Sequence, residues 1–446
     1  MKRLTKADFR EFLRAKLFTP LHDIALEGQG FIGIELESFV HIDEAPHGKR
    51  PLSLYEEPKG LAHVLLAKST HHTLEYKKGT DPKPVLNSLS YPNKDSIRFE
   101  PGGQIEIISS PCISFKELRE HITERQALQD MLSRDFGITF TQSGTNPWFT
   151  AKEIGLQMQL PRYQSLAKYL EALSAYGPQM MLQTCSMHIN LDLGAHDTTK
   201  VKRFVAANLL TPFAAAIFAN SPIIAGKETP YQSYRTFIWQ HLDATRTGIF
   251  DTKEISKNWN IEAVVDAYYE LAINAPIIFI EELEGYISPQ NHTLAYWIDQ
   301  PLQGISPSLA DFERHLTLLF PSIRLKGYLE LRAIDAPPRE WQMAAPLFFC
   351  GLLYTDSILD QVLALLLPLE DRINALSKES VYGLKSDEIY AVSRQLMELA
   401  ISGNELLMPG FMDQESLELL VRFSKTFTSQ RRTFADEAIS HWRKTL

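Results

Sequence analysis

Hydrophobic and polar residues alternate along several short stretches of this chain, and this pattern predicts β-strands. In the stretch FIGIELESFVHI, Ile34 and Leu36 take one face, whereas Glu35 and Glu37 take the other. The same alternation predicts strands over residues 31–42, 95–99, 104–110, 138–143, 184–194 and 328–335. Each of these strands offers one apolar face to a core.

Helical periodicity covers much of the rest of the chain. A hydrophobic period near 3.6 residues predicts helices over 115–136 and about 198–219, and over most of the chain from about 340 onwards. The N-terminal MKRLTKADFREFLRAKLF also predicts a helix rather than a signal peptide. Because strands and helices do not alternate regularly, the pattern favours an α+β fold with one mainly antiparallel sheet backed by helices.

The polar faces of the predicted strands are rich in acids. Glu35 and Glu37 share one face, Glu106 lies on the polar face of QIEI, and Glu330 precedes Arg332 on that of YLELR. The strand SMHIN adds Ser186, His188 and Asn190, and Glu100 stands beside the turn PGG. Gly-Gly suits a tight turn, because neither residue has a Cβ to forbid positive φ.

These acids have two interpretations. Half-solvated strands commonly have polar outer faces, so each strand alone fits an ordinary wet surface. If the strands share one sheet face, however, five carboxylates lie close together and repel one another unless cations sit among them. Carboxylate oxygens and an imidazole suit Mg²⁺ or Mn²⁺. The sequence therefore predicts a metal site formed by Glu35, Glu37, Glu100, Glu106, His188 and Glu330.

Several divalent ions in one site point to a phosphate substrate such as ATP, whose charge must be neutralised before a nucleophile approaches. The chain contains neither GxxxxGK[ST] nor GxGxxG. We therefore expect metals and a few cationic side chains to hold the nucleotide.

A second group of candidate residues lies in YQSYRTFIWQHLDATRTG, which contains Tyr234, Arg235 and Arg246. Arginine grips a carboxylate through two parallel hydrogen bonds. Surface ion pairs are the alternative role for these arginines. Near an acidic metal site they would instead bind an anionic substrate.

Composition narrows the class of protein. The 446 residues include 45 basic and 54 acidic ones, without a basic stripe, which argues against nucleic acid as a partner. Three scattered cysteines do not form a disulfide framework and indicate a reducing, cytoplasmic location. The apolar stretch 346–370 is interrupted by Asp356 and Asp360, and predicts a buried helix rather than a membrane span.

Five motifs in order resemble the glutamate–cysteine ligases of the plant and proteobacterial branch, and the related ligases of ergothioneine biosynthesis. They are GIELE, EPGGQIE, ANSP, SYRTFIW with DATRTG, and HLTLLFPSIRLKGYLELRAID, over about residues 30–350. The resemblance implies a glutamine-synthetase-like fold, in which a curved antiparallel sheet holds the site within a single catalytic unit over residues 1–446. It also implies that ATP drives the joining of L-glutamate and L-cysteine through a γ-glutamyl phosphate.

The resemblance assigns roles to individual residues. The five glutamates fall where the family has metal-binding acids, and His188 falls where some branches have histidine. Arg235 matches the arginine expected to hold the glutamate α-carboxylate, and Arg332, with Glu330, matches a catalytic position near the transferring phosphoryl group. Tyr234 and Arg246 are expected beside the substrate, and Asn190 beside the substrate and the nucleotide.

Two alternatives stay open at this stage. One is a carboxylate–amine ligase that uses an amine other than cysteine. The other is a non-catalytic relative that senses glutamate or nucleotide. The expected partners are small molecules only, with neither nucleic acid nor membrane, and the expected assembly is a monomer or a homodimer.

Overall fold

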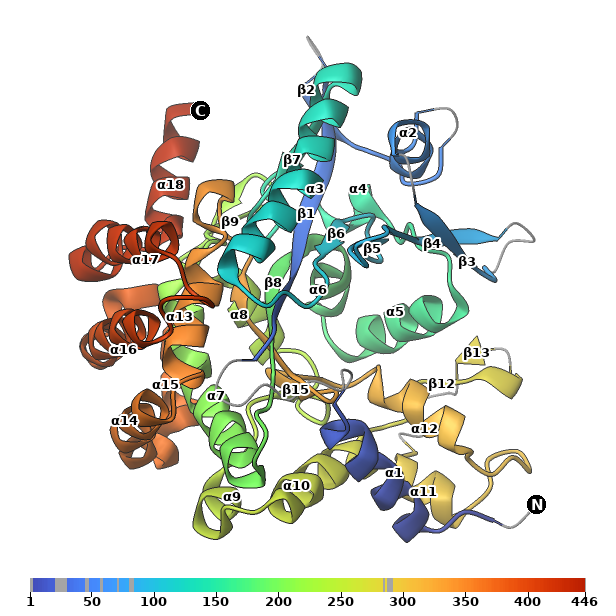
Figure 1. Cartoon of the computed structure of the whole chain (residues 1–446). Helices are drawn as coiled ribbons and strands as arrows, with labels where there is room; N and C mark the ends of the chain where they lie inside the picture. The colour runs from blue at the N-terminus through green and yellow to red at the C-terminus, as the bar shows by residue number, and fades with distance from the viewer. Residues whose placement is uncertain are drawn as a thin grey trace.

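A large antiparallel sheet organises the protein. The computed structural model describes residues 3–20, 30–44, 48–56, 59–69, 72–79, 84–283, 285–286 and 292–445. Within these residues ten strands form one sheet, in the order β15-β16-β8-β1-β6-β5-β4-β3, with β2 and β7 also paired to β1 (Figure 1). Their bounds are β1 Ile32–Glu44, β2 Gly48–Pro51, β3 Thr73–Lys77, β4 Val85–Ser90, β5 Ser96–Phe99, β6 Ile105–Ile108, β7 Ile138–Thr141, β8 Ser186–Leu191, β15 Ile323–Leu325 and β16 Leu329–Asp335.

The apolar face of the central strands packs into the main core. Ile32, Ile34 and Leu36 of β1 are at most 2% exposed, and Met187 and Ile189 of β8 are completely buried. Burying a side chain of this size contributes about 1.5–3 kcal/mol, so the alternation fixes which face turns inward. The opposite face is left to the polar residues.

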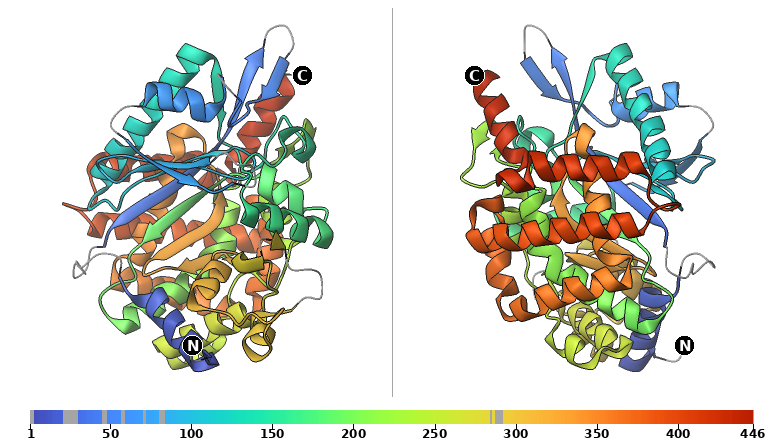
Figure 2. Two further views of the ribbon diagram at one scale, coloured as in Figure 1. Left: turned by 90° about the vertical axis from the view of Figure 1, so that its right-hand side faces the viewer. Right: turned by 60° about the vertical axis from the view of Figure 1, so that its left-hand side comes forward.

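Helices from the second half of the chain cover that apolar face. The core cluster joins β1, β8 and β16 to α7 (Asp197–Ile217) and α13 (Ala344–Leu353). Figures 1 and 2 show the remaining C-terminal helices outside these two. They are α14 Asp356–Leu366, α15 Ile373–Ser380, α16 Asp387–Leu406, α17 Gln414–Thr426 and α18 Phe434–Thr445.

The apolar stretch 346–370 forms two helices and not the one predicted. The backbone is extended at Thr355, between α13 and α14, and Arg203 donates a hydrogen bond to the carbonyl oxygen of Leu353 at the end of α13. Among the described residues no single helix is long and apolar enough to cross a membrane; the segments Arg339–Leu353 and Asp356–Ser380 reach that threshold only as a pair, bent by 92°.

Other helices surround the polar face or the ends of the sheet. Side chains of α1 (Lys6–Phe18), α5 (Pro161–Leu173), α6 (Gly177–Gln183), α8 (Tyr234–Gln240) and α12 (Leu309–Leu316) line a cavity against that face. The other helices are α2 Leu61–Lys68, α3 Phe115–Phe136, α4 Ala151–Ile154, α9 Lys253–Asn258, α10 Ile261–Asn274 and α11 Leu294–Asp299. Short strand pairs join β9 Ile223–Ile224 to β10 Lys227–Glu228, β11 Thr247–Gly248 to β14 Phe320–Pro321, and β12 Phe279–Ile280 to β13 Gly285–Tyr286.

The predicted α+β fold class is confirmed. The helix predicted over 115–136 has those bounds, because the Ser114 side chain caps its first turn and Gly137, at φ 67°, ends it. The single catalytic unit over residues 1–446 stays a prediction.

Candidate functional site

Strand register brings the predicted acids onto one face of the sheet. Glu37 pairs directly with Glu106 across β1 and β6, and Glu35 pairs with His188 across β1 and β8. Glu330 of β16 pairs with Asn190 of β8. Directly paired residues of antiparallel strands point to the same side. The structure therefore places these side chains together, as the alternation predicts.

The turn after β5 carries the fifth acid into the same group. Gly103 has φ 81°, a conformation open to glycine, and a Cβ on Gly102 would lie 3.0 Å from the backbone of Leu182. Glu100 closes the turn, because its N–H donates to Gln104 and its carbonyl oxygen accepts from Gly103. The two glycines thus hold Glu100 beside Glu106.

Two groups of ligand atoms lie close enough together to share a cation. Atoms of Glu35, Glu106 and His188 all lie within 4.8 Å of one another, and so do atoms of Glu37, Glu100 and Glu106. Glu106 belongs to both groups. Carboxylate oxygens with one imidazole fit Mg²⁺ or Mn²⁺.

Three of these acids are only partly compensated by the cations and hydrogen bonds around them. Burial and the charge of Glu100 raise the pKa of Glu37 to about 8. Burial, together with Glu35, Glu100 and Glu37, raises the pKa of Glu106 well above its usual range. Burial also raises the pKa of Glu100, against the lowering effect of Arg332. A divalent cation would remove this cost.

The acids toward β16 are compensated instead. Glu330 is fully buried, but the charges of Arg324, Lys326 and Arg332 lower its pKa well below the usual range. Their nitrogens lie 3.5, 3.0 and 2.8 Å from its carboxylate oxygens. Burial and Arg332 lower the pKa of His188 to about 4, so its imidazole is neutral at pH 7, the form that binds a metal.

Glu35 connects the two halves of the acid group. One carboxylate oxygen lies 2.9 Å from His188 Nδ1, and the other accepts a hydrogen bond of 3.0 Å from Asn190. Burial and Glu330 oppose ionisation, yet the contacts with His188 and Lys326 help to lower the pKa of Glu35 to about 2. This acid stays charged.

A cavity of about 840 Å³ lies over this face. It is lined by the five acids and His188, and also by cations and aromatic residues that the sequence did not single out: Arg98, Arg162, Arg324, Lys326, Tyr163, Trp239 and Tyr328. Alternation would have found Arg98, which pairs with Glu106, and Arg324, which pairs with Glu330. Arg162 and Trp239 come from helices, where that signal does not exist.

Arg235 and Arg332, which the resemblance assigns to the glutamate α-carboxylate and the transferring phosphoryl group, both line the cavity. Arg235, at the start of α8, is 4% exposed and donates a hydrogen bond of 3.0 Å to the carbonyl oxygen of Arg332. Arg332 binds Glu330 and leaves part of its guanidinium toward the cavity. The two arginines therefore lie next to each other at the wall of the cavity.

The structure does not bring Arg246 and Tyr234 into the cavity, so their substrate roles stay predictions without support from this geometry. Arg246 is completely buried, and each of its three guanidinium nitrogens donates a hydrogen bond of 2.7–2.9 Å within the protein, to Asp243, Leu318 and Pro276. Tyr234 stacks with Tyr231 and Phe237, outside the residues that line the cavity.

Asn190 lies at the edge of the site. It lines an adjoining cavity of about 930 Å³, which shares Glu35, Arg98, Lys326 and Tyr328 with the first. Among the described residues, its Oδ1 is buried without a hydrogen-bond partner, whereas Oε2 of Glu330 lies 3.0 Å from Lys326 Nζ. A buried oxygen without a donor suits a ligand group, which supports the predicted binding role of Asn190. That role and the metal role of Glu330 stay predictions.

Chloroplastic glutamate–cysteine ligases of plants are similar to this chain. The chloroplastic glutamate–cysteine ligase of Medicago truncatula is 32% identical over 346 residues, which cover 75% of this chain and 66% of that protein. The enzyme of Arabidopsis thaliana is 33% identical over 279 residues, or 61% of this chain and 51% of that protein. This chain therefore matches about half to two thirds of the length of these relatives.

A solved structure and a family model also match this chain. A crystal structure of glutamate–cysteine ligase from Francisella tularensis, in complex with AMP, matches with a TM-score of 0.54 over 93% of this chain and 85% of that one. Its sequence identity is 13%, so the likeness concerns the fold. The model of glutamate-cysteine ligase family 2 matches residues 31–418. The chain belongs to glutamate-cysteine ligase family 2.

Proposed function

We propose that this protein joins the γ-carboxylate of L-glutamate to the amino group of L-cysteine, with conversion of ATP to ADP and phosphate. The main support is the group of five carboxylates from three strands and one turn, gathered at a cavity that also contains arginines and a lysine. The Francisella tularensis relative holds AMP, which supports a nucleotide substrate here.

The chemistry follows from the low reactivity of a carboxylate. An oxygen of the glutamate γ-carboxylate attacks the γ-phosphorus of ATP, the bond to the bridging oxygen breaks, and ADP leaves. The neutral amine of cysteine then attacks the acyl carbon of the γ-glutamyl phosphate. The carbon–oxygen bond breaks, phosphate leaves and the amine loses a proton. No covalent bond to the protein is required.

The residues of the cavity divide this work. Arg235 binds the α-carboxylate of glutamate, because a guanidinium fits a carboxylate with two parallel hydrogen bonds. Arg332 stabilises charge on the transferring phosphoryl group, and Glu330 fixes its guanidinium at 2.8 Å. Arg324 and Lys326 add positive charge on the same side.

The acids and His188 fit divalent cations. Their spacing and the raised pKa values of Glu37, Glu100 and Glu106 favour this assignment. Bound Mg²⁺ or Mn²⁺ would supply charge neutralisation of the nucleotide phosphates. The residues that would hold it are Glu35, Glu37, Glu100, Glu106, His188 and Glu330.

The test is release of phosphate from ATP and glutamate with and without cysteine, in Mg²⁺, together with mass detection of γ-glutamylcysteine. We expect release to depend on cysteine. Glu37→Gln protein, purified in parallel, measures contaminating ATPase. No cysteine-dependent release above that background would overturn the proposal. A scan of other amino acids and amines under the same conditions separates a ligase with a different acceptor from the cysteine ligase, and nucleotide binding without turnover favours a sensor.

Location and assembly are proposals of the same kind. The three cysteines are free and buried, which fits a reducing compartment, and a cytoplasmic location stays a prediction. A monomer or homodimer is expected, and light scattering of the purified protein measures which one forms.

A further inference from the structure

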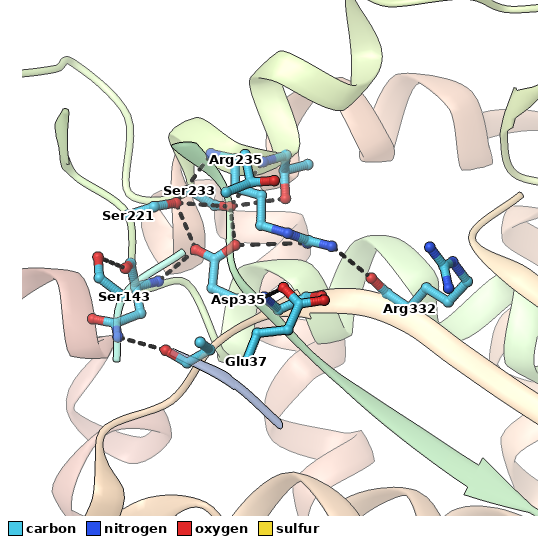
Figure 3. A network of polar contacts seen from close by, with 12 residues as sticks. Glu37, Ser143, Ser221, Ser233, Arg235, Arg332 and Asp335 are labelled. Carbon is cyan, nitrogen blue, oxygen red and sulfur yellow. Dashed lines mark hydrogen bonds and ion pairs between the residues drawn. The ribbon is translucent and has the colours of Figure 1, made fainter. Parts of the chain in front are cut away.

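Asp335, the last residue of β16, is a buried acid without an assigned role. It is 1% exposed, and burial raises its pKa. Its Oδ2 accepts hydrogen bonds from the Asn220 backbone N–H (2.8 Å) and the Ser221 hydroxyl (2.7 Å), and its Oδ1 accepts from the Ser233 hydroxyl (3.0 Å). Figure 3 shows this carboxylate enclosed by the segments that carry the two serines. Such a buried, fully bonded carboxylate holds its partners in fixed positions.

These partners lead directly to Arg235. The Ser221 hydroxyl, which donates to Asp335, accepts a hydrogen bond of 3.0 Å from the backbone N–H of Arg235. Ser233 is the N-cap of α8 and accepts from the N–H of Thr236. Both serines therefore attach the first turn of α8 to Asp335, and Arg235 lies in that turn.

Asp335 also acts on the guanidinium itself. Arg235 Nη1 lies 3.9 Å from Asp335 Oδ1, while Nη2 donates to the Arg332 carbonyl oxygen (Figure 3). Glu37 attracts the same guanidinium from the acid group. Removing the charge of Asp335 therefore removes an ion pair that helps to hold the guanidinium in its present position.

We infer that Asp335 is a positioning residue, which, through Ser221 and Ser233, fixes Arg235 to receive the α-carboxylate of glutamate. This inference rests on the proposed function. It concerns one substrate: the nucleotide and the acceptor amine gain nothing from the contact, so the effect is confined to glutamate.

The main test is Asp335→Asn, which keeps the size of the side chain and removes its charge. A hydrogen-bonded charge in this setting is worth about 10- to 100-fold in affinity, so we expect the glutamate KM to rise by that factor. We expect kcat to stay within about threefold and the ATP KM within about twofold, because neither depends on Arg235.

Two further variants disturb the connection between Asp335 and Arg235 by changing other residues. Ser221→Ala removes the link to the Arg235 backbone and should raise the glutamate KM by about 3- to 10-fold. Gly144→Ala keeps the aspartate, but its Cβ would lie 2.4 Å from Asp335 Cγ and displace the carboxylate. Ser393→Ala is the matched control, because Ser393 is buried and its hydroxyl has no hydrogen-bond partner within the part of the chain that the structure describes. Asp299→Asn is the control for removing an exposed aspartate charge.

Calorimetric titration with glutamate separates this inference from the proposed function, since it needs neither cysteine nor turnover. Weaker glutamate binding in Asp335→Asn and Ser221→Ala, with unchanged ATP binding, supports positioning. An unchanged glutamate affinity, or an equal loss for glutamate and ATP, overturns it. If the wild-type protein shows no cysteine-dependent turnover, the proposed ligase function is overturned. The comparison of glutamate binding between the wild type and the variants still tests the role of Asp335.

Discussion

Two buried arginines, Arg235 and Arg246, have opposite surroundings in spite of similar burial. The Arg246 guanidinium has three acceptors at 2.7–2.9 Å and lies over the ring of Tyr169. The Arg235 guanidinium has one backbone acceptor at 3.0 Å, an acid at 3.9 Å and a side open to the cavity. All three nitrogens of the Arg246 guanidinium are hydrogen-bonded within the protein, whereas the Arg235 guanidinium still has donors that face the cavity.

The difference separates charges that build the fold from charges that await a ligand. A buried charge with all its hydrogen bonds made is a structural element, and its removal strands its partners. A buried charge with capacity left over, such as Arg235 or the acids around Glu106, marks a place where a ligand completes the bonding. The following variants test this distinction.

The largest effect is expected for Glu37→Gln. Glutamine resembles the protonated acid, which the raised pKa already favours, so the protein should fold as well as the wild type. It loses the charge that a cation requires, and we expect kcat to fall by more than about 1000-fold. Steady-state phosphate release at saturating substrates measures the loss.

Glu75→Gln is the control for that variant, because Glu75 lies on β3 of the same sheet, outside the lining of the cavity, and its described contacts are with Ser88, Asn87 and Lys77. Its kcat should equal that of the wild type. Near-wild-type turnover in Glu37→Gln would remove Glu37 from the set of metal ligands.

Arg246→Met should act on stability instead. The substitution removes the hydrogen bonds that Arg246 donates to the Asp243 carboxylate and to two carbonyl oxygens, all of which stay buried. We therefore expect the free energy of unfolding to fall by about 3–5 kcal/mol. Activity per folded molecule should not change. Urea denaturation, with kinetics at low temperature, measures both. A raised glutamate KM with little loss of stability would contradict the distinction between the two arginines.

The sequence predicted what depends on local pattern. Alternation in β1, β6, β8 and β16 places Glu35, Glu106 and His188 on one face, because antiparallel pairing preserves that alternation across strands. It did not separate Arg235 from Arg246, since the acceptors of Arg246 at Pro276 and Leu318 come from distant parts of the chain.

Asp335 shows a second limit of the pattern. Strict alternation from Glu330 would turn Asp335 to the apolar face. A β-bulge between Leu331 and Ile334 shifts the register, and Asp335 pairs with Ser186, on the same face as His188. The local sequence contains no pattern that predicts this bulge, so the position of Asp335 on the polar face could be recognised only in the structure.

Arg235→Lys should have an effect of intermediate size. A lysine keeps the charge but lacks the two-pronged geometry, and we expect the glutamate KM to rise by about 10-fold with a small change in kcat. Stability should not fall as it does in Arg246→Met, because the Arg235 guanidinium donates one described hydrogen bond, to a backbone carbonyl oxygen, whereas that of Arg246 donates three. An unchanged glutamate KM would detach Arg235 from the substrate.

The smallest effect is a dependence of stability on pH in metal-free protein. Because the pKa of Glu37 is raised to about 8 in the folded state, the folded protein binds a proton there that the unfolded chain has released above pH 5. Stability therefore falls as pH rises toward 8, and in EDTA we expect the melting temperature to drop by about 1–3 °C between pH 7 and 8.5. Mg²⁺ should reduce the slope of melting temperature against pH, because it compensates the charge of Glu37. Glu37→Gln should reduce the slope without Mg²⁺, since glutamine does not titrate. Differential scanning fluorimetry across this pH range measures all three slopes. Equal slopes for the wild type and Glu37→Gln in EDTA would show that the acid group is already compensated within the protein, as Arg246 is, and would remove the contrast between the two regions.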